Sequence, residues 1–506
     1  MTEFLIANMA PLMFMALVMF LLLGYPVAFA LAANGLAFGL LGIELGLLQP
    51  QLLQALPERV FGIMRNDTLL AIPFFTFMGL ILERSGMAED LLDTIGQLFG
   101  PLRGGLAYAV VFVGALLAAT TGVVAASVIS MGLISLPIML RYGYDRRVAT
   151  GIIAASGTLA QIIPPSLVLI VMADQLGRSV GDMYEGALVP GLILTALYGG
   201  YILLITLLRP HAAPALPPEA RTLRGFKLLQ RVLFSLVPPL VLIFLVLGTI
   251  FMGIATPTEG GAMGASGALI LALMKRKLTP TLLKQAMNST AKLSSFVLFI
   301  LIGSTVFGLV FRAVNGDLWV EHLLTGLPGG QLGFLIVVNI LVFVLAFFLD
   351  FFELAFIIVP LLGPVAEKMG IDLIWFGILL GVNMQTSFMH PPFGFALFFL
   401  RSVAPKDEYT DKVTGKRIKG ISTGDIYRGA IPFVCIQIIM VALVIAFPEM
   451  VGHAPNEVQD LDNIQINIDV PSYGEVSQPP SSIPMENNPG ADLQRQLELQ
   501  LQQDNQ

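Results

Sequence analysis

The sequence predicts an all-α polytopic membrane protein built on an inverted repeat, with two re-entrant hairpins and two proline-broken helices. Of its 506 residues, 56% are hydrophobic and only 12% are charged, and the mean hydropathy is +0.82. A soluble domain usually carries about twice that charge. Many apolar runs reach the roughly 20 residues that a helix needs to cross a bilayer. A nucleotide-binding or catalytic domain would therefore have to come from another chain.

A pattern of Pro, Gly and Asp occurs twice at a constant offset of 227 residues. The first copy consists of Pro137, Gly143, Asp145, Pro164 and Pro165, and the second of Pro364, Gly370, Asp372, Pro391 and Pro392. Each copy is a long apolar stretch, a short polar loop, and an apolar helix that Pro-Pro interrupts near its middle. Duplicated, proline-broken hydrophobic segments indicate a secondary transporter whose binding site lies where the broken helices meet.

Apolar runs of suitable length predict the membrane spans. They lie at 5–23, 27–48, 69–83, 148–172, 186–208, 232–252, 257–274, 293–312, 373–400 and 432–449. Two further segments, 105–140 and 331–365, are too long for one span. We interpret each as a hairpin that enters and leaves by one face. Two full spans in each segment would give the same topology, because each span needs about 20 residues.

The loop charges predict the orientation of these spans. Of the 28 basic residues, 22 fall in loops that the span list places on one face. These loops cover 84–103, 141–147, 209–231, 275–292 and 401–428. Basic loops face the cytoplasm, so both termini are expected on the periplasmic side. An odd number of spans separates the two hairpins, which makes the repeat inverted.

The expected organisation follows from these spans. Residues 1–67 form N-terminal scaffold helices, 68–172 the first inverted repeat, 173–292 connecting scaffold helices, 293–400 the second inverted repeat, 401–450 a cytoplasmic loop with the last span, and 451–506 a tail. The tail carries nine acidic residues against one base, Arg495. With so few large apolar residues it cannot offset the entropy of ordering, so we expect it to be disordered and periplasmic.

The two Pro-Pro pairs favour binding of an ion and a solute. Proline removes an amide donor and clashes with the preceding turn, so each pair frees backbone carbonyls. Such groups are tolerated at membrane depth only where protein or a water-filled cavity covers them. Freed carbonyls beside Ser, Thr and Asn oxygens suit a small cation, and exposed N-termini of half-helices attract an anion. The alternative is a pair of structural kinks.

The candidate site residues lie at the hairpin tips and in the breaks. They are Thr120, Thr121 and Ser127 near the first tip, Ser156 and Thr158 in the first break, Asp350 and Glu353 at the second tip, and Asn383, Gln385, Thr386 and Ser387 in the second break. We expect Na⁺ near Thr121, Ser156, Asp350 and Asn383. Acids inside a membrane are costly and usually functional or paired. A D-x-x-E helix cap explains Asp350 and Glu353 equally well, and both roles can hold.

Other motifs indicate structure or exclude chemistry. Thr256, Pro257 and Glu259 predict a capping box that opens the helix at 257. The sequence has no phosphate-binding Gly-Lys-Ser/Thr loop and no Cys/His metal cluster, and no hydrolase triad is evident. We therefore expect no enzymatic activity, no cofactor besides a coupling ion, and no nucleic-acid partner.

The sequence resembles the large membrane subunit (the M subunit, DctM-like) of tripartite ATP-independent periplasmic (TRAP) transporters. The matching motifs, in order, are LAIPFF (70–75), RSGMA (84–88), LRGGL (102–106), IIPPS (162–166), GIATPTE (253–259), GLPGG (326–330), FLD (348–350), NMQTS (383–387) and DIYRG (425–429). The resemblance covers about residues 4–450. The chain departs from it at Thr120-Thr121-Gly122, where many members carry Ser-Gly-Ser, at His390, and in the acidic tail.

The resemblance implies a division of labour in the bacterial inner membrane. A periplasmic receptor (P-type) captures an organic acid, and a small four-helix membrane subunit (Q-type) supports the large one. Uptake is coupled to a Na⁺ gradient. The hairpins and broken helices move as one elevator-like body, in a fold like that of the ion transporter superfamily.

Two other functions remain open on the sequence alone. A stand-alone symporter or antiporter would share the same inverted-repeat core. A membrane subunit of a redox complex would need haem or quinone ligands in facing spans. Only His322 and His390 come near membrane segments, and they lie in different elements.

Overall fold

The computed structural model describes residues 2–411 and 413–452, with the side chain of Thr121 excepted. The predicted tail lies almost entirely outside the described residues. Within them the chain is helical apart from one short antiparallel hairpin of strands. Six described helices are long and apolar enough to cross a membrane, or up to eight if each bent pair counts as one span. This confirms the predicted all-α polytopic membrane fold.

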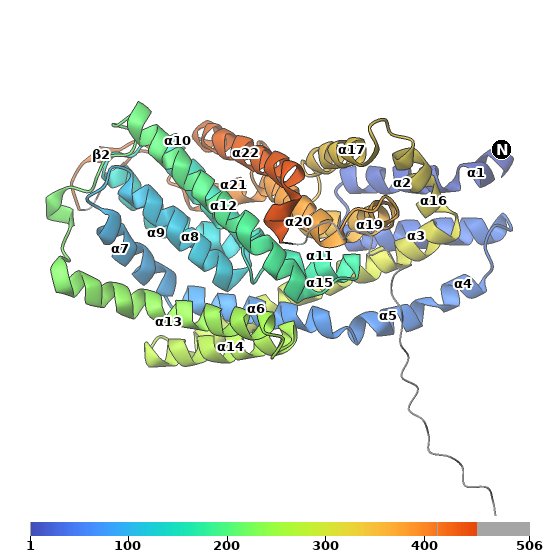
Figure 1. Ribbon diagram of the computed structural model, residues 1–506, viewed down its shortest axis with the longest axis horizontal. Helices are drawn as coiled ribbons and strands as arrows, with labels where there is room; N and C mark the ends of the chain where they lie inside the picture. Colours follow the sequence, from blue (N-terminus) through green and yellow to red (C-terminus); the bar gives the residue numbers. More distant parts are fainter. Residues whose placement is uncertain (1, 412, 453–506) are drawn as a thin grey trace, which may run out of the picture. The chain divides into compact units, whose positions relative to one another are not determined.

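Figure 1 shows the helices in sequence colours. Before the first repeat come α1 (Thr2–Ala7), α2 (Met9–Leu22), α3 (Val27–Glu44), α4 (Gln51–Gln54) and α5 (Leu56–Met64). The first repeat contains α6 (Asp67–Arg84), α7 (Met87–Phe99), α8 (Gly105–Thr121), α9 (Val124–Arg141), α10 (Arg146–Thr158), η1 (Leu159–Gln161) and α11 (Leu167–Leu176). The connecting elements are α12 (Val180–Leu208), η2 (Pro218–Ala220), α13 (Gly225–Phe251) and α14 (Pro257–Met274).

The second repeat and the C-terminal elements follow. The second repeat contains α15 (Pro280–Ala313), α16 (Gly316–Thr325), α17 (Gly330–Leu345), α18 (Phe351–Ile357), α19 (Val359–Lys368), α20 (Leu373–Met384), η3 (Gln385–Phe388) and α21 (Phe395–Val403). After it come β1 (Tyr409–Thr410), β2 (Arg417–Ile418), α22 (Thr423–Ala446) and η4 (Pro448–Val451). The strands pair Tyr409 with Ile418 and Thr410 with Arg417.

The repeated residues do the same structural work in both copies. Gly143 and Gly370 both have positive φ, +85° and +74°, in the loop before the broken helix, a conformation that glycine adopts without strain. Asp145 and Asp372 then cap that helix, because their side chains accept backbone N–H groups of its first turn. Residues 227 positions apart in the sequence therefore occupy equivalent turns and equivalent helix starts in the two repeats.

Both broken helices are interrupted where Pro-Pro predicts. In the first, α10 ends at Thr158, a 3₁₀ turn follows, and α11 begins only after Pro164 and Pro165. In the second, α20 gives way to a 3₁₀ turn and α21 begins after the second Pro-Pro pair. The first interruption lies entirely among buried residues. In the second, Gln385, Thr386 and Ser387 are buried, whereas Pro392 and Phe393 are exposed. The freed backbone groups of the first break are thus covered by protein, as an apolar surrounding requires.

The two repeats are interlocked. Helix α6 of the first repeat packs on α14, and α15 of the second repeat packs on α3 (Figure 1). Likewise α10 packs on α21, and α11 packs on α20. These contacts come in equivalent pairs: the α6–α14 contact corresponds to the α15–α3 contact, and the α10–α21 contact corresponds to the α20–α11 contact. An approximate twofold axis therefore relates the two halves.

The start of the first broken helix lies beside the end of the second. Arg146, at the start of α10, donates to the carbonyl of Gly420 at 3.0 Å. Arg401, near the end of α21, donates to the neighbouring carbonyl of Ile421 at 2.5 Å. These two helix ends therefore share the loop that joins α21 to α22.

The other ends of the broken helices also lie together. Arg178, just after α11, donates to Glu367 near the end of α19 at 2.8 Å, and α20 begins a few residues later at Leu373. The two broken helices therefore run in opposite directions. This antiparallel arrangement is what an inverted repeat requires.

Each hairpin segment enters and leaves at one end. In the first segment, the backbone N–H of Leu106 donates to the hydroxyl of Tyr144 at 3.2 Å, which joins the start of α8 to the loop after α9. In the second, Gln331 at the start of α17 donates to the carbonyl of Met369 at 2.6 Å. The turns lie at residues 122–123 and 346–350, between the helices of each segment.

The structure contains short helices between the predicted spans. Helices α7 and α16 occupy 87–99 and 316–325, and α4 with α5 occupies 51–64. Helices α7 and α16 are related by the repeat and precede the two hairpins. They are too short to span a bilayer, so the length criterion that identified the spans does not detect them.

We predict that Gly303→Ala destabilises the protein. A Cβ at Gly303 would lie 2.4 Å from the carbonyl oxygen of Ala28, so α3 and α15 would have to separate. Overpacking of this kind costs about 1–3 kcal/mol. The apparent melting temperature of the full chain in detergent should fall. The control is Gly199→Ala, with nothing within 4 Å; an equal fall in both variants would contradict the proposed contact.

Candidate functional site

The two breaks meet through a pair of repeat-related residues. The side-chain amide of Gln385 donates to the hydroxyl of Thr158 at 3.1 Å, and the two residues are 227 positions apart. Both are fully buried. Symmetry-related residues touch one another only beside the axis that relates them. The approximate twofold axis therefore passes close to this hydrogen bond.

Polar side chains from flanking helices extend this contact. The hydroxyl of Tyr198 on α12 lies within hydrogen-bonding reach of Thr158. Gln437 on α22 donates to the same tyrosine hydroxyl at 3.0 Å. All of these groups are buried, where a hydrogen bond is electrostatically stronger than in water. The chain of bonds fixes the 3₁₀ segments at the centre.

The candidate residues Ser156 and Asn383 lie two positions before the residues of this central bond. Asn383 is held on α17 by Asn339, because its amide donates to the backbone carbonyl at 2.8 Å and to the side-chain oxygen at 2.9 Å. Ser156 lies against Gly114 on α8, where an added Cβ would come within 2.6 Å of the serine Cβ. Each hairpin thus packs one arm on the first half of its own broken helix.

Several buried oxygens at this centre have no hydrogen-bond partner within residues 2–411 and 413–452. They are Ser156 Oγ, Gln161 Oε1, Gln385 Oε1 and Ser387 Oγ. A buried acceptor without a partner costs about 1–3 kcal/mol. These four oxygens all come from the two breaks. Hard oxygens of this kind can act as ligands for an alkali or alkaline-earth cation.

Four helices begin around a cavity of about 250 Å³ beside this centre. They are α9 and α11 of the first repeat and α18 and α21 of the second. The lining comprises Gly122, Val123, Val124, Ala125, Gln161, Leu167, Val168, Leu293, Phe296, Asp350, Phe351, Phe352, Phe388, Phe395 and Phe399. Apart from Gln161 and Asp350, these side chains are apolar. The cavity therefore offers backbone groups and few polar side chains.

The four helix starts differ in their caps. Ser166 caps α11 by accepting the N–H of Val168 at 3.1 Å, and Asp350 caps α18. The starts of α9 and α21 lack a side-chain cap, because Val123 and Gly394 stand at the capping positions. The first N–H groups of a helix have no partner within it. One helix of each repeat therefore presents uncapped amides to the cavity.

Asp350 and Glu353 form a reciprocal capping box. The Glu353 N–H donates to the Asp350 carboxylate at 2.9 Å, and the Asp350 N–H donates to the Glu353 carboxylate at 2.9 Å. The D-x-x-E cap weighed in the sequence is thus present. Since the carboxylate of Asp350 also lines the cavity, the cap places a negative charge opposite the uncapped helix starts.

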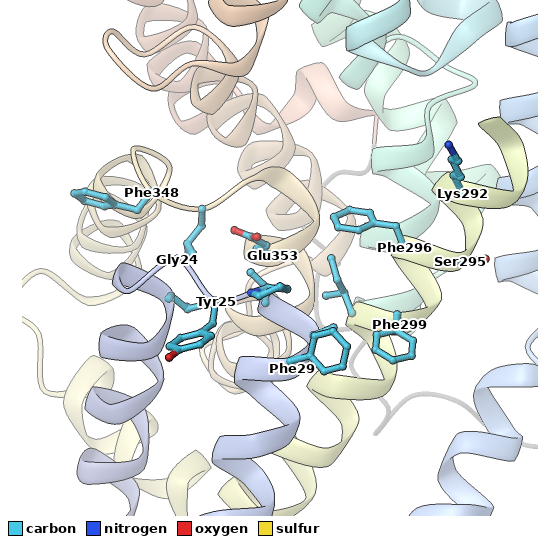
Figure 2. Close-up of a pocket in the computed structure, with 15 residues that line it drawn as sticks. Gly24, Tyr25, Phe29, Lys292, Ser295, Phe296, Phe299, Phe348 and Glu353 are labelled. Carbon is cyan, nitrogen blue, oxygen red and sulfur yellow. The ribbon is translucent and has the colours of Figure 1, made fainter. Parts of the chain in front are cut away.

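A second cavity of about 580 Å³ lies next to the first, because Phe296 lines both. Figure 2 shows Glu353 of α18 on one side of it and Phe296 with Lys292 of α15 on the other. Tyr25 and Phe29, around the start of α3, complete the wall. This cavity is therefore bounded by the second hairpin tip, by α15 and by the start of α3.

The chain matches the family model of the tripartite ATP-independent periplasmic transporter, DctM component, over residues 14–450. The chain belongs to the DctM family of TRAP transporters. It is thus a transporter component of the inner membrane that crosses it several times, and it is not an enzyme. The resemblance seen in the sequence motifs is confirmed.

Named relatives agree with this assignment. The chain is 30% identical to the C4-dicarboxylate TRAP transporter large permease protein DctM of Pseudomonas aeruginosa, over 81% of this chain and 91% of the relative. It is 27% identical to the sialic acid TRAP transporter large permease protein SiaM of Vibrio cholerae, over 84% and 93%. It is 28% identical to the isethionate TRAP transporter permease protein DctMQ of Oleidesulfovibrio alaskensis, over 80% of this chain and 62% of the relative.

The YdaH transporter of Alcanivorax borkumensis has a similar fold. Its crystal structure matches with a TM-score of 0.54 at 15% identity, over 79% of this chain and 90% of that one. This similarity concerns the fold alone. It agrees with an all-α polytopic membrane architecture for this DctM-family chain.

The structure separates the candidate residues of this DctM-family chain into groups. Thr158 and Gln385 meet in the central hydrogen bond. Ser156 faces α8 and Asn383 faces α17, and Ser387 is buried in the second break. Asp350 and Glu353 lie at the second hairpin tip. The hydroxyls of Thr120 and Thr386 donate to the carbonyls of Leu117 and Asn383 in their own helical turns. Ser127 is buried in the first turn of α9. The side chain of Thr121 lies outside the described residues.

Some site residues were missed by the sequence analysis. Gln161 and Ser166 lie in the first break but were not selected as candidates. Asn339, Tyr198 and Gln437 lie in apolar helices, where a single polar side chain was an available signal. The uncapped starts of α9 and α21 carry no signal, because a missing cap leaves an ordinary residue in the sequence.

We predict that Thr158 and Gln385 are energetically coupled. A double-mutant cycle of Thr158→Val and Gln385→Leu should give a coupling free energy of about 0.5–1.5 kcal/mol in the stability of the full chain in detergent. The control pairs Thr158→Val with Thr94→Val. Thr94 lies on α7, bonded to Asp90, so those two changes should be additive. Additivity in both cycles would contradict a direct bond between the breaks.

Proposed function

We propose that this chain is the large permease subunit that takes up an organic acid by Na⁺-gradient-driven symport. A periplasmic receptor delivers the acid, and the hairpins with the broken helices carry it across in an elevator-type movement. The observation that carries the proposal is the polarised cavity, where uncapped helix starts and a carboxylate face one space.

The uncapped starts of α9 and α21 support binding of an acid group. Each helix N-terminus carries a partial positive charge and favours a nearby anion by up to about 2 kcal/mol in a partly buried geometry. Val124 and Ala125 at one start and Phe395 at the other line the cavity. The apolar remainder of the lining suits the carbon skeleton of a small organic acid.

The coupling ion is proposed to bind near Thr121, Ser156, Asp350 and Asn383. The unpartnered oxygens of the breaks and the carboxylate of Asp350 supply the hard oxygen ligands that an alkali cation prefers. A bound cation also offsets the negative charge of a carboxylate substrate in the same space. Binding of each then favours binding of the other, which is the thermodynamic basis of symport.

The names of the relatives support an acidic substrate. C4-dicarboxylates, sialic acid and isethionate all carry a carboxylate or a sulfonate group. These molecules differ in size and in the rest of their structure. We therefore assign to this chain the acid group they share, and leave selection of the individual acid to the receptor.

The walls of the larger cavity support an elevator-type movement, because the tip of the second hairpin forms one wall and helix α15 forms the other. The hairpin tips and broken helices are joined through reciprocal packing of α10 with α21 and α11 with α20. Helices α3 and α15 pack together, as do α6 and α14, and these pairs contact the hairpins and broken helices through α15 with α18 and through α6 with α8 and α11. Since α15 and α18 provide opposite walls of the larger cavity, displacement of the hairpin along α15 would open or close it.

The proposed partners are a periplasmic substrate receptor and a small membrane subunit. The family is described as one component of a tripartite transporter. The relative DctMQ is longer than this chain, which matches 62% of it, and its name joins M and Q. We also propose that the basic loops face the cytoplasm and that both termini are periplasmic.

We predict that Asp350→Ala and Asn383→Ala abolish Na⁺-dependent uptake while the protein stays folded in the membrane. Removal of either side chain takes a proposed ligand away from the ion. The control is Asp372→Ala, which also removes an aspartate cap, bonded to Trp375 N–H at 2.8 Å, and costs about 0.5–2 kcal/mol of stability. Uptake into vesicles is measured as a function of the Na⁺ gradient. Normal Na⁺ dependence in both site variants would refute the ligand assignment.

We also predict that uptake requires all three components. Vesicles that contain this chain and the small subunit should accumulate the acid only when the receptor is added and a Na⁺ gradient is present. Accumulation by this chain alone would favour a stand-alone symporter or antiporter. Loss of uptake when the gradient is dissipated, with ATP absent throughout, checks the energy source.

A further inference from the structure

A third cavity, of about 940 Å³, lies far from the transport site along the chain, at the end of the helices that carries the basic loops. Three segments line it: the turn between α9 and α10, the loop around η2, and the β1–β2 hairpin. Arg141, Arg146, Lys416, Arg417 and Lys419 contribute positive charge to the lining. Glu219 is the one carboxylate among the lining residues that the structure describes.

Two of these arginines are held in place by the protein. The Nε of Arg141 donates to both carboxylate oxygens of Asp411, at 3.0 and 3.2 Å. Its two terminal nitrogens take no part in this pair and are left for a ligand. Arg146 donates through one terminal nitrogen to the carbonyl of Gly420 and lies 3.8 Å from Asp425. Both guanidinium groups are therefore ordered before any ligand arrives.

Asp411 is itself firmly fixed. Thr414 donates to its carboxylate from both the hydroxyl, at 2.7 Å, and the backbone N–H, at 2.8 Å. These bonds from Thr414, together with Arg141, lower the pKa of Asp411 to about 2. The carboxylate therefore stays ionised at physiological pH, and the Arg141 side chain keeps its position.

The cations of the β-hairpin have no such partners. Lys416, Arg417 and Lys419 are exposed and form no ion pair or side-chain hydrogen bond within the described chain. Asp411 and Asp425 offset the charges of the two fixed arginines, so the three hairpin cations supply the excess of positive charge against Glu219. Such an excess of charge in a concave site is the usual mark of an anion-binding pocket.

We propose that this pocket binds a phosphate group, and that the group belongs to the headgroup of an anionic phospholipid. The planar fork of an arginine matches phosphate oxygens two at a time. Basic pockets at the ends of membrane helices bind such headgroups. Tyr142 and the 69% exposed Val413 give the pocket an apolar rim, and the buried Leu140 also lines it. This apolar surface suits the glycerol and acyl part of a lipid better than a free phosphate.

Occupation of the pocket would join segments that the chain places far apart. Arg141 and Arg146 belong to the first repeat, Glu219 to the connection between α12 and α13, and Lys416 to Lys419 to the loop before α22. A phosphate bound to several of these cations would stabilise their packing. We expect the lipid to raise the stability of the whole chain as well as to bind to it.

The test compares two triple variants of the full chain in detergent. K416Q/R417Q/K419Q removes the unpartnered cations of the pocket. R276Q/K277Q/K284Q removes three exposed cations around the α14–α15 turn, outside the pocket, and serves as the charge-matched control. Native mass spectrometry and thermal unfolding are measured with added phosphatidylglycerol, with phosphatidylcholine, and with inorganic phosphate.

We expect phosphatidylglycerol to bind and stabilise the wild type and the control, and phosphatidylcholine to do neither. The pocket variant should bind phosphatidylglycerol about 100-fold more weakly. Each of the three basic residues contributes a factor of about five, and the factors multiply. A second variant, E219Q, removes the opposing carboxylate and should bind the lipid more tightly than the wild type. This gain cannot result from misfolding.

Two results would overturn the proposal. Equal loss of binding in both triple variants would mean general attraction between basic residues and lipid, without a specific pocket. Stabilisation by inorganic phosphate as strong as that by phosphatidylglycerol, and lost in the pocket variant, would keep the phosphate site and overturn the lipid as its source.

Discussion

The centre of the molecule depends on a single hydrogen bond between repeat-related residues, Thr158 and Gln385. A helix that stops leaves backbone groups without partners inside it. Each break bonds some of these groups locally, since Ser166 donates to the Gln161 carbonyl at 2.5 Å and Thr386 to the Asn383 carbonyl at 2.6 Å. The breaks also meet at the approximate twofold axis, where their side chains share polar partners with Tyr198 and Gln437. The buried oxygens that remain without partners at this centre come from these two breaks, and this is the reason for proposing the ion site there.

Interlocking of the repeats extends this constraint to the rest of the fold. Each half of one broken helix packs on the opposite half of the other, and α3 and α14 pack on the helices of the opposite repeat. Neither repeat can bury its apolar faces without the other, so they must form together. The same reciprocity joins the two broken helices, and the proposed elevator-type movement would displace them as one body together with the hairpin tips.

The sequence predicted the architecture well, because its determinants are local and repeated. Pro-Pro marks the breaks between α10 and α11 and between α20 and α21, although Pro238 and Pro239 lie inside the continuous helix α13. Asp145 and Asp372 cap helices through bonds that span a few residues. The length criterion failed for α7 and α16, which are shorter than any span. The site was predicted less completely. Thr158 and Gln385 were both candidates, but the sequence does not say where the symmetry axis passes, so their bond could not be foreseen.

The repeats have kept their backbone and diverged at their caps, and this divergence gives the site its polarity. Helices α9 and α18 are related by the repeat, yet Val123 leaves the first uncapped while Asp350 caps the second with a carboxylate. Ser166 caps α11, and its counterpart α21 begins at an uncapped Gly394. Fully symmetric caps would have given a site attractive to one sign of charge only. Because each repeat has one capped and one uncapped helix start, positive helix ends and a carboxylate face the same cavity, which is the arrangement that the proposed binding of a cation beside an acid requires.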